Sequence, residues 1–178
     1  MARRHSLPRL WLMTDERMGE RLWVALGRLP RGSGVVFRHY SLALAERRAL
    51  FAKVATVARR RRLVLVRAGA DWLGRGEAGV HGRRSRRGQL VTWPAHDRTE
   101  LVAGTRAGAD LFFVSPVFAT RSHPDARALG TVRLGLLVRG SPRPAIALGG
   151  MTSARAKRLR SLNIHGWAAI DAWTGTGA

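Results

Sequence analysis

Polar side chains and a glycine pair stand directly after short apolar runs in this sequence, and their types suit the binding of a phosphate. One polar loop carries Thr120, Ser122 and His123, which supply two hydroxyl groups and an imidazole. The pair Gly149-Gly150 stands before a predicted helix, where backbone N–H groups that no side chain covers can approach an anion. The glycine pair therefore predicts an anion-binding site, and the loop is a candidate for ligand contacts.

Charged residues at the ends of other apolar runs add candidates for charge stabilisation and proton transfer. Arg38 can neutralise phosphate oxygens or serve as an ordinary salt-bridge partner. His96 can move a proton near neutral pH, or only cap and pack against the helix that follows it. Asp15 and Asp171 follow the first and last apolar runs and could form an acid–base pair or a metal site. For these two carboxylates we favour pairing with nearby arginines.

The elements that must position these residues alternate along the chain. Short apolar runs predict strands at residues 10–13, 34–37, 63–66, 79–81, 90–92, 111–114, 144–148 and 167–170. Helical patterns lie between them at residues 18–28, 42–60, 97–107, 131–139 and 152–162. This alternation predicts an α/β fold, a closed (β/α)8 TIM barrel, with an open doubly wound sheet as the alternative. Both folds place chemistry at the carboxyl ends of the strands.

The length of the chain limits this barrel. With 178 residues the chain suits a single domain, residues 1–178, but falls short of the ~250 residues typical of the fold. We therefore expect helices 3, 4 and 8 to be reduced or missing; only seven residues follow Asp171. A missing helix 8 would leave barrel surface uncovered between strands 8 and 1, and we expect a homodimer to bury it.

The composition is strongly basic, with 32 Lys and Arg residues against 11 Asp and Glu and a net charge of +21. Such a charge attracts anionic partners. However, the arginines are spread along the chain, and no nucleic-acid-binding motif accompanies them. A small-molecule phosphate ester is therefore the expected partner, and nucleic acid is not.

The remaining composition excludes several classes of site. The chain contains no cysteine, so disulfides, thiolate catalysis and cysteine-bound metals are ruled out. No apolar run reaches the ~18 residues that a membrane span needs, and the first residues lack the apolar segment of a signal peptide. We expect a cytoplasmic protein without membrane contact.

The order of the strand ends resembles the thiamine-phosphate synthase family, which includes the thiazole tautomerase TenI. The matching segments in chain order are LWLMTD, VVFRHY, PAHD, SPVFAT, ALGG and AAIDA. The most specific part is PVFAT at residues 116–120, followed by LG at 129–130 and GG at 149–150. The resemblance covers nearly the whole chain and implies a TIM barrel of thiamine biosynthesis. It also implies a reaction that joins a pyrimidine methyl diphosphate to a thiazole phosphate, with diphosphate as the leaving group.

The resemblance assigns the diphosphate contacts of the family to four of the candidates. Arg38 stands where the family has an arginine that contacts the diphosphate. Thr120 and Ser122 match hydroxyl-bearing positions of the loop after strand 6. His123 stands where a diphosphate-binding lysine is usual.

The thiazole phosphate contacts and the proton shuttle follow from the same resemblance. Gly149 and Gly150 match the phosphate-binding glycines, and Ile170-Asp171 stand at the final Val-Ser of the family. An aspartate is a departure at that place, because its charge is unfavourable beside a bound phosphate. His96 matches the histidine that is placed to shuttle a proton in the tautomerase branch.

The magnesium ligands of the family have no counterpart in this sequence. The Asn-Asp pair after strand 3 is replaced by VRAG at residues 66–69, and the aspartate-containing stretch after strand 4 by HGRRSR at residues 81–86. Mg²⁺ is thus expected for the family, but both of its usual carboxylate positions are lost. No metal ligand and no cofactor is predicted for this chain.

Three functions remain open at this point. The first is a thiamine-phosphate synthase/TenI family enzyme that joins or processes a thiazole phosphate, a transferase if synthase activity is kept. The second is a metal-independent thiazole phosphate tautomerase that uses His96. The third is a non-catalytic, arginine-rich barrel that binds a thiamine-related ligand or RNA.

Overall fold

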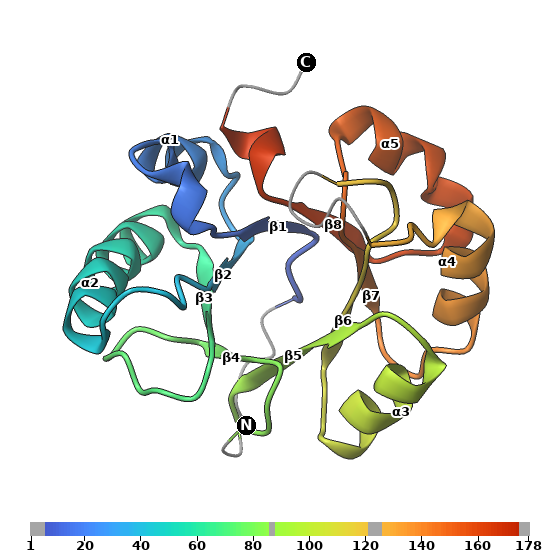
Figure 1. Ribbon diagram of the computed structural model, residues 1–178, viewed down its shortest axis with the longest axis horizontal. Helices are drawn as coiled ribbons and strands as arrows, with labels where there is room; N and C mark the ends of the chain where they lie inside the picture. The colour runs from blue at the N-terminus through green and yellow to red at the C-terminus, as the bar shows by residue number, and fades with distance from the viewer. Residues whose placement is uncertain (1–5, 86–87, 121–125, 175–178) are drawn as a thin grey trace.

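The computed structural model describes residues 6–85, 88–120 and 126–174. Its parallel strands pair in sequence order, and the last pairs with the first, so that they close into an eight-stranded barrel (Figure 1). The strands are β1 (Leu10–Met13), β2 (Gly34–Phe37), β3 (Val64–Ala68), β4 (Gly79–His81), β5 (Leu90–Ala95), β6 (Leu111–Val114), β7 (Ala145–Ala147) and β8 (Gly166–Ala169). The predicted closed barrel is confirmed, and the open sheet is wrong.

The helices on the outside of the barrel are fewer than its strands. Those in the described ranges are α1 (Arg21–Arg28), α2 (Leu44–Arg61), α3 (Arg98–Arg106), α4 (Gly130–Arg139) and α5 (Ser153–Arg158). No helix follows β3 or β4 in the residues described there, and β8 is followed only by a short 3-10 turn, η3 (Asp171–Trp173). The expected helices 3, 4 and 8 are those that would follow the third, fourth and eighth strands. The expectation that these helices are reduced or missing is thus confirmed.

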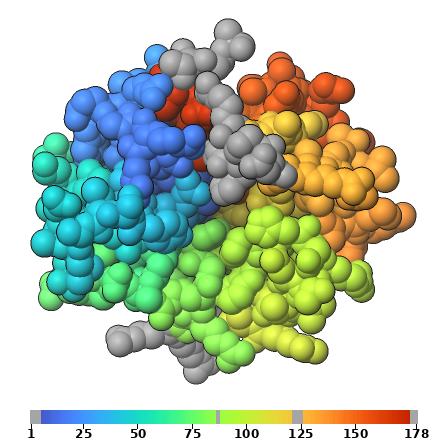
Figure 2. Space-filling model, in the orientation of Figure 1, coloured from blue at the N-terminus to red at the C-terminus, as the bar shows by residue number. Residues whose placement is uncertain are grey.

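The helices group on two sides of the barrel. α1 and α2 lie on one side, and α3, α4 and α5 on the other (Figure 1). The space-filling view shows the same division, with the first third of the chain in blue and cyan opposite the orange C-terminal helices (Figure 2). None of the described helices is both long and apolar enough to cross a membrane.

The inside of the barrel is filled by side chains. The buried members of this inner core are Trp11, Met13, Val36, Val66, Ala68, Leu111, Phe113, Ile146 and Ala168. The ring of Trp11 meets that of Phe113 edge-on, with centroids 5.1 Å apart. Gly34 is required beside Trp11, because a Cβ at this glycine would lie 2.1 Å from the indole ring. The barrel is therefore a packed core, and a ligand can enter only at its ends.

A buried arginine ties α2 to the ends of two strands. The buried face of this helix consists of Arg47, Phe51, Val54 and Ala58. The Arg47 guanidinium donates hydrogen bonds to the backbone carbonyls of Arg38 and Ala68, at 2.8 and 2.7 Å. These bonds satisfy carbonyls at the carboxyl ends of β2 and β3, so the arginine fixes that corner of the barrel.

A second buried arginine holds the loop between β3 and β4, where a regular barrel of this fold has a helix. Arg67 alternates with β3 residues whose side chains fill the barrel, so its own side chain points outward. Its Nε donates to the carboxylate of Glu77 at 2.5 Å, and the two side chains are only 7 and 10 % exposed. Its Nη1 donates to the carbonyls of Gly69 and Asp71. One ion pair thus organises a loop that has no helix.

Tryptophans cover part of the surface that a full helix 8 would cover. Trp173, in η3, stacks on Trp167 of β8 with ring centroids 5.0 Å apart. Its indole N–H donates to the carbonyl of Trp11 in β1 at 3.1 Å. The turn therefore bridges the strands that close the barrel. The homodimer expected at this surface stays a prediction.

Candidate functional site

Two adjacent cavities open at the carboxyl ends of the strands, an end that we call the barrel mouth. The larger cavity has a volume of about 450 Å³ and is lined from the ends of all eight strands. The smaller, of about 250 Å³, lies beside the ends of β7 and β8. The two share four lining residues, namely Thr120, Leu148, Gly149 and Ile170. Their place is the one at which this fold supports chemistry.

Most of the predicted site residues meet at the barrel mouth. Those that line the larger cavity are Arg38, His96, Thr120, Gly149 and Ile170. The smaller cavity adds Gly150 and Asp171. Ser122 and His123 lie outside the described residues, so their part in the site stays a prediction. The structure brings the other candidates together from five different strand ends, although they are spread over 134 positions, from 38 to 171.

The glycine pair has the backbone that an anion site requires. Gly149 and Gly150 both have a positive φ, of 94° and 59°. A Cβ at Gly149 would lie 2.7 Å from Cα of Pro116, and one at Gly150 would lie 2.5 Å from the carbonyl oxygen of Ala119. Within the part of the chain that the structure describes, neither glycine N–H donates a hydrogen bond. Two backbone donors are thus left for a ligand.

Arg155 is a cation beside the glycine pair that the pattern of strand ends does not reveal. Its guanidinium donates to the carbonyl of Gly150 and lies over the ring of Phe118, with Cζ 4.9 Å from the ring centroid. It lines the smaller cavity. The helix that carries it has only six residues, so the donors available to an anion here are Arg155 and the glycine N–H groups rather than the helix dipole.

Arg38 both lines the larger cavity and takes part in an ion pair. Its Nε donates to the carbonyl of Thr14 at 2.8 Å, and its Nη2 donates to Asp15, also at 2.8 Å. Asp15 accepts a second charged hydrogen bond from Arg17 at 2.7 Å. The bond from Arg17 is the main reason that the pKa of Asp15 lies below its usual range, although partial burial acts in the opposite direction. The expected pairing of Asp15 with arginines is present.

His96 is oriented by a carboxylate at the rim of the larger cavity. Its Nδ1 lies 2.7 Å from Oε2 of Glu100, and its backbone N–H donates to the same oxygen at 2.6 Å. Glu100 begins α3, where its own N–H donates to the capping carboxylate of Asp97 at 2.9 Å. An ionised carboxylate only accepts hydrogen bonds, so Nδ1 is the donor to Glu100, and in the neutral imidazole Nε2 is the nitrogen that can accept a proton.

His81 is a second imidazole at the barrel mouth. The sequence does not single it out, because the segment at residues 81–86 is notable there only for the absence of the family's metal-binding aspartate. Its Nδ1 lies 2.9 Å from Oγ1 of Thr92, and its ring meets Phe113 edge-on. Burial lowers the pKa of His81 to about 4, and the nearby charge of Arg38 adds a smaller effect in the same direction. The imidazole is therefore neutral at physiological pH and forms part of the polar floor of the cavity.

The carboxylates at the mouth do not fit the magnesium ion that the family implies. Asp15 is bonded to two arginines, and Asp71 pairs with Arg47 at 3.5 Å. Among the described residues, no group of three or more His, Asp or Glu side chains could hold a metal ion. Magnesium prefers several oxygen ligands without competing cations. We therefore derive no chemical step through a metal.

Comparisons with known proteins show similarity to this chain in sequence for some proteins and in fold for others. The family model described as thiamine monophosphate synthase, TMP-TENI, matches residues 29–173. The thiamine-phosphate synthase of Chloroflexus aurantiacus is 33 % identical over 85 residues, which cover 47 % of this chain and 39 % of that protein. The thiamine-phosphate synthase of Geobacillus kaustophilus is 38 % identical over 80 residues, 44 % of this chain and 36 % of that protein.

These alignments span less than half the length of the curated relatives. The structural likeness is more extensive. The thiamine phosphate pyrophosphorylase of Pyrococcus furiosus superposes with a TM-score of 0.77 at 18 % identity, over 94 % of this chain and 88 % of that one. At this identity the superposition shows a shared fold and no more. Because the family model spans β2 to η3, and thus every cavity-lining position from Arg38 to Asp171, the chain belongs to the thiamine-phosphate synthase/TenI family.

Proposed function

We propose that this protein is a thiamine-biosynthesis enzyme that processes a thiazole phosphate by moving a proton without a metal ion. The observation that carries the proposal is the His96–Glu100 pair at the rim of a cavity that also contains Gly149. A base and a phosphate site in one cavity are what a tautomerase of a phosphorylated substrate needs.

The phosphate end of the substrate is held by the groups around the smaller cavity. The N–H groups of Gly149 and Gly150 and the guanidinium of Arg155 supply donors for its oxygens. Thr120 adds a hydroxyl where the two cavities meet. Ser122 and His123 are proposed as further contacts from the same loop, and Ile170-Asp171 as the wall below the phosphate.

The thiazole ring then occupies the larger cavity, where His96 acts on it. Nε2 of His96 takes a proton from a saturated carbon of the non-aromatic tautomer, the double bonds shift, and the proton returns to a carbon at the other end of the shifted double bonds. One C–H bond breaks and one forms, so the formula of the substrate is unchanged. Glu100 stabilises the imidazolium that exists between the two transfers, because its carboxylate accepts from Nδ1.

The test is NMR-detected tautomerisation of a thiazole phosphate in D₂O, in the presence of a chelator. The wild-type protein should interconvert the tautomers, and His96→Ala should lower the rate about 10²- to 10⁴-fold, the usual contribution of a positioned acid–base group. His165→Ala is the matched control, because it removes an imidazole from the opposite end of the barrel. An unchanged rate in His96→Ala, or a rate that the chelator abolishes, would exclude this mechanism.

Synthase activity is the second candidate, and the names of the curated relatives favour it. In that reaction Arg38 would contact the diphosphate of a pyrimidine substrate in the larger cavity, beside a thiazole phosphate in the smaller one. Calorimetric titration with pyrimidine methyl diphosphate, with and without magnesium, separates the two candidates. Magnesium-dependent binding would support the synthase, and binding of thiazole phosphate alone would support the tautomerase.

A further inference from the structure

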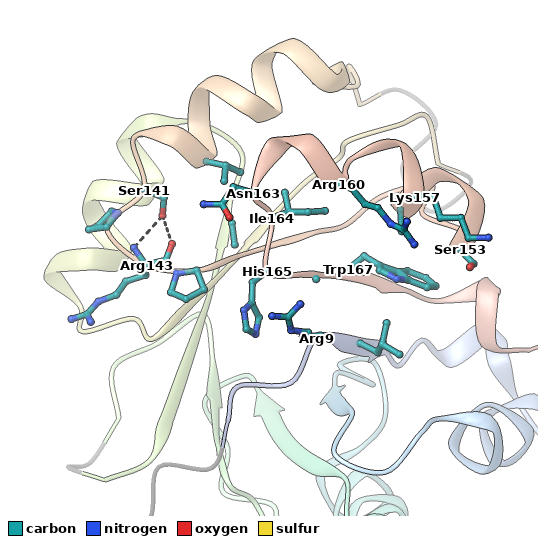
Figure 3. Close-up of a pocket in the computed structure, with 17 residues that line it drawn as sticks. Arg9, Ser141, Arg143, Ser153, Lys157, Arg160, Asn163, Ile164, His165 and Trp167 are labelled. Carbon is teal, nitrogen blue, oxygen red and sulfur yellow. Dashed lines mark hydrogen bonds between the residues drawn. The ribbon is translucent and has the colours of Figure 1, made fainter.

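A groove at the other end of the barrel has no part in the proposed reaction. It has a volume of about 800 Å³ and lies at the amino ends of β7, β8 and β1, below α5 (Figure 3). Its wall on the helix side carries Lys157 and Arg160, and its wall on the strand side carries Arg9 and Trp167 (Figure 3). Arg143 stands at one end, in the loop that leads into β7.

The groove collects positive charge without counter-charge. Four of the residues that line it are cationic, Arg9, Arg143, Lys157 and Arg160, and none is acidic. In residues 6–85, 88–120 and 126–174, these four side chains make no ion pair and donate no hydrogen bond. Arg38 and Arg47 at the barrel mouth differ, since each of them is paired with a carboxylate. Uncompensated like charges repel one another, and an anion in the groove would relieve that repulsion.

The backbone that carries these cations is fixed. The carbonyl of Arg9 accepts a hydrogen bond from the N–H of Trp167 at 2.8 Å, which joins the two strand ends. The hydroxyl of Ser141 donates to the carbonyl of Arg143 at 2.6 Å and accepts from its N–H at 3.3 Å (Figure 3). The ring of Trp167 is held by stacking on Trp173. Only the flexible side chains of the cations need to adjust around a ligand.

We propose that this groove binds a short polyphosphate chain, either inorganic or as the triphosphate of a nucleotide. Cations on two facing walls suit a ligand with several negative charges in a row, and guanidinium groups match phosphate oxygens in geometry. The volume is that of a small-molecule site. On the strand-side wall, Trp167 offers a planar surface against which a nucleotide base can lie.

The experiment compares two double variants that remove the same amount of charge. Inorganic triphosphate and ATP are each titrated by calorimetry into the wild type, into Lys157→Gln/Arg160→Gln and into Arg59→Gln/Arg60→Gln. The second pair is exposed on the last turn of α2 and lines neither the groove nor the mouth. We expect the groove variant to weaken triphosphate binding about tenfold or more, and the control by less than about twofold, because charge-assisted contacts act locally at physiological salt.

The outcomes separate this groove from the mouth and from the general positive field. Movement of the Trp167 indole N–H signal in NMR spectra, assigned through Trp167→Phe, would locate the ligand in the groove. Tighter binding of ATP than of triphosphate would identify a nucleotide as the ligand, and equal binding would identify the phosphate chain alone. Three results would each overturn the proposal: equal losses of triphosphate affinity in the two double variants, no binding of triphosphate by the wild type, or NMR signal movements confined to residues of the barrel mouth.

Discussion

The two sides of the barrel mouth use their polar groups differently. On the side of β1 to β3, Arg38 and Arg47 donate to strand-end carbonyls and to carboxylates, so that these cations hold protein to protein. On the side of β6 to β8, the N–H groups of Gly149 and Gly150 have no acceptor among the described residues, and Arg155 lies beside them. The first side uses its cations for bonds within the protein, and the second has backbone donors that the described residues leave unused.

The loop that follows β3 in place of a helix gives a physical reason for part of this difference. β3 is followed by a loop, so the ends of β2 and β3 and the loop itself rely on Arg47 and on the Arg67–Glu77 pair. β6 and β7 are each followed by a helix, and the segments after these two strands continue to pair, since Val117 N–H donates to the carbonyl of Leu148. Where helices and strand pairing supply stability, the loop groups are free to serve a site.

The largest expected effect comes from filling the glycine pair. Gly149→Ala should lower the free energy of unfolding by about 3 kcal/mol, since strain at a positive φ costs about 1–2 kcal/mol and the new Cβ also meets the backbone of Pro116. Binding of thiazole phosphate should weaken in parallel. Urea unfolding and calorimetry measure the two effects.

Gly108→Ala is the matched control for this variant, because Gly108 also has a positive φ, of 84°, but a Cβ there would meet nothing within 4 Å. Gly108→Ala should lower the free energy of unfolding only by the backbone strain at the positive φ, about 1 kcal/mol. Equal costs in the two variants would mean that the close approach of Pro116 does not define the phosphate side of the mouth.

A pH-dependent effect is expected from His81, on the floor between the two sides. The imidazole is neutral in the folded protein, with a pKa of about 4 against 6.5 in the unfolded chain. The unfolded chain therefore binds more protons between these values, and stability is lost as the pH falls from above 6.5 towards 4. Between pH 7.5 and pH 5 the loss should be about 2 kcal/mol.

The measurement is urea unfolding at both pH values, in the wild type and in His81→Gln. Glutamine keeps a group that can bond to Thr92 but does not titrate, so the variant should lack this part of the pH dependence. An identical pH dependence in the two proteins would show that His81 is exposed to water and titrates normally.

The smallest expected effect tests whether Arg38 can bind a ligand once its ion pair with Asp15 is broken. Asp15→Asn should lower stability by about 1 kcal/mol, because the ion pairs it breaks are only partly buried. The same change releases Nη2 of Arg38 into the larger cavity and should raise the affinity for inorganic diphosphate about threefold. Glu46→Gln, an exposed position outside both cavities, removes an equal charge as the control. A similar gain in Glu46→Gln would attribute the effect to net charge alone.

The strand ends could be predicted from the sequence because each is a short apolar run followed by a polar or glycine-rich segment. That pattern located Arg38, His96, Thr120, Gly149 and Ile170, which all line one cavity. The same pattern did not indicate Arg155 or His81, for different reasons. Arg155 is one arginine among many on a short helix, and His81 follows a strand of only three residues.

The sequence by itself predicted the strand–helix order, the absent helices and the family, because these depend on apolar periodicity, chain length and the spacing of a few motifs, whereas the structure decided between a closed barrel and an open sheet. Only the tertiary structure decided which charges are paired. The guanidinium of Arg47 donates to the carbonyls of Arg38 and Ala68 in two other segments, and the four cations that line the groove come from the segments before β1 and β7, from α5 and from the 3-10 turn that follows α5. Pairing depends on distance in space, and a sequence records only distance along the chain.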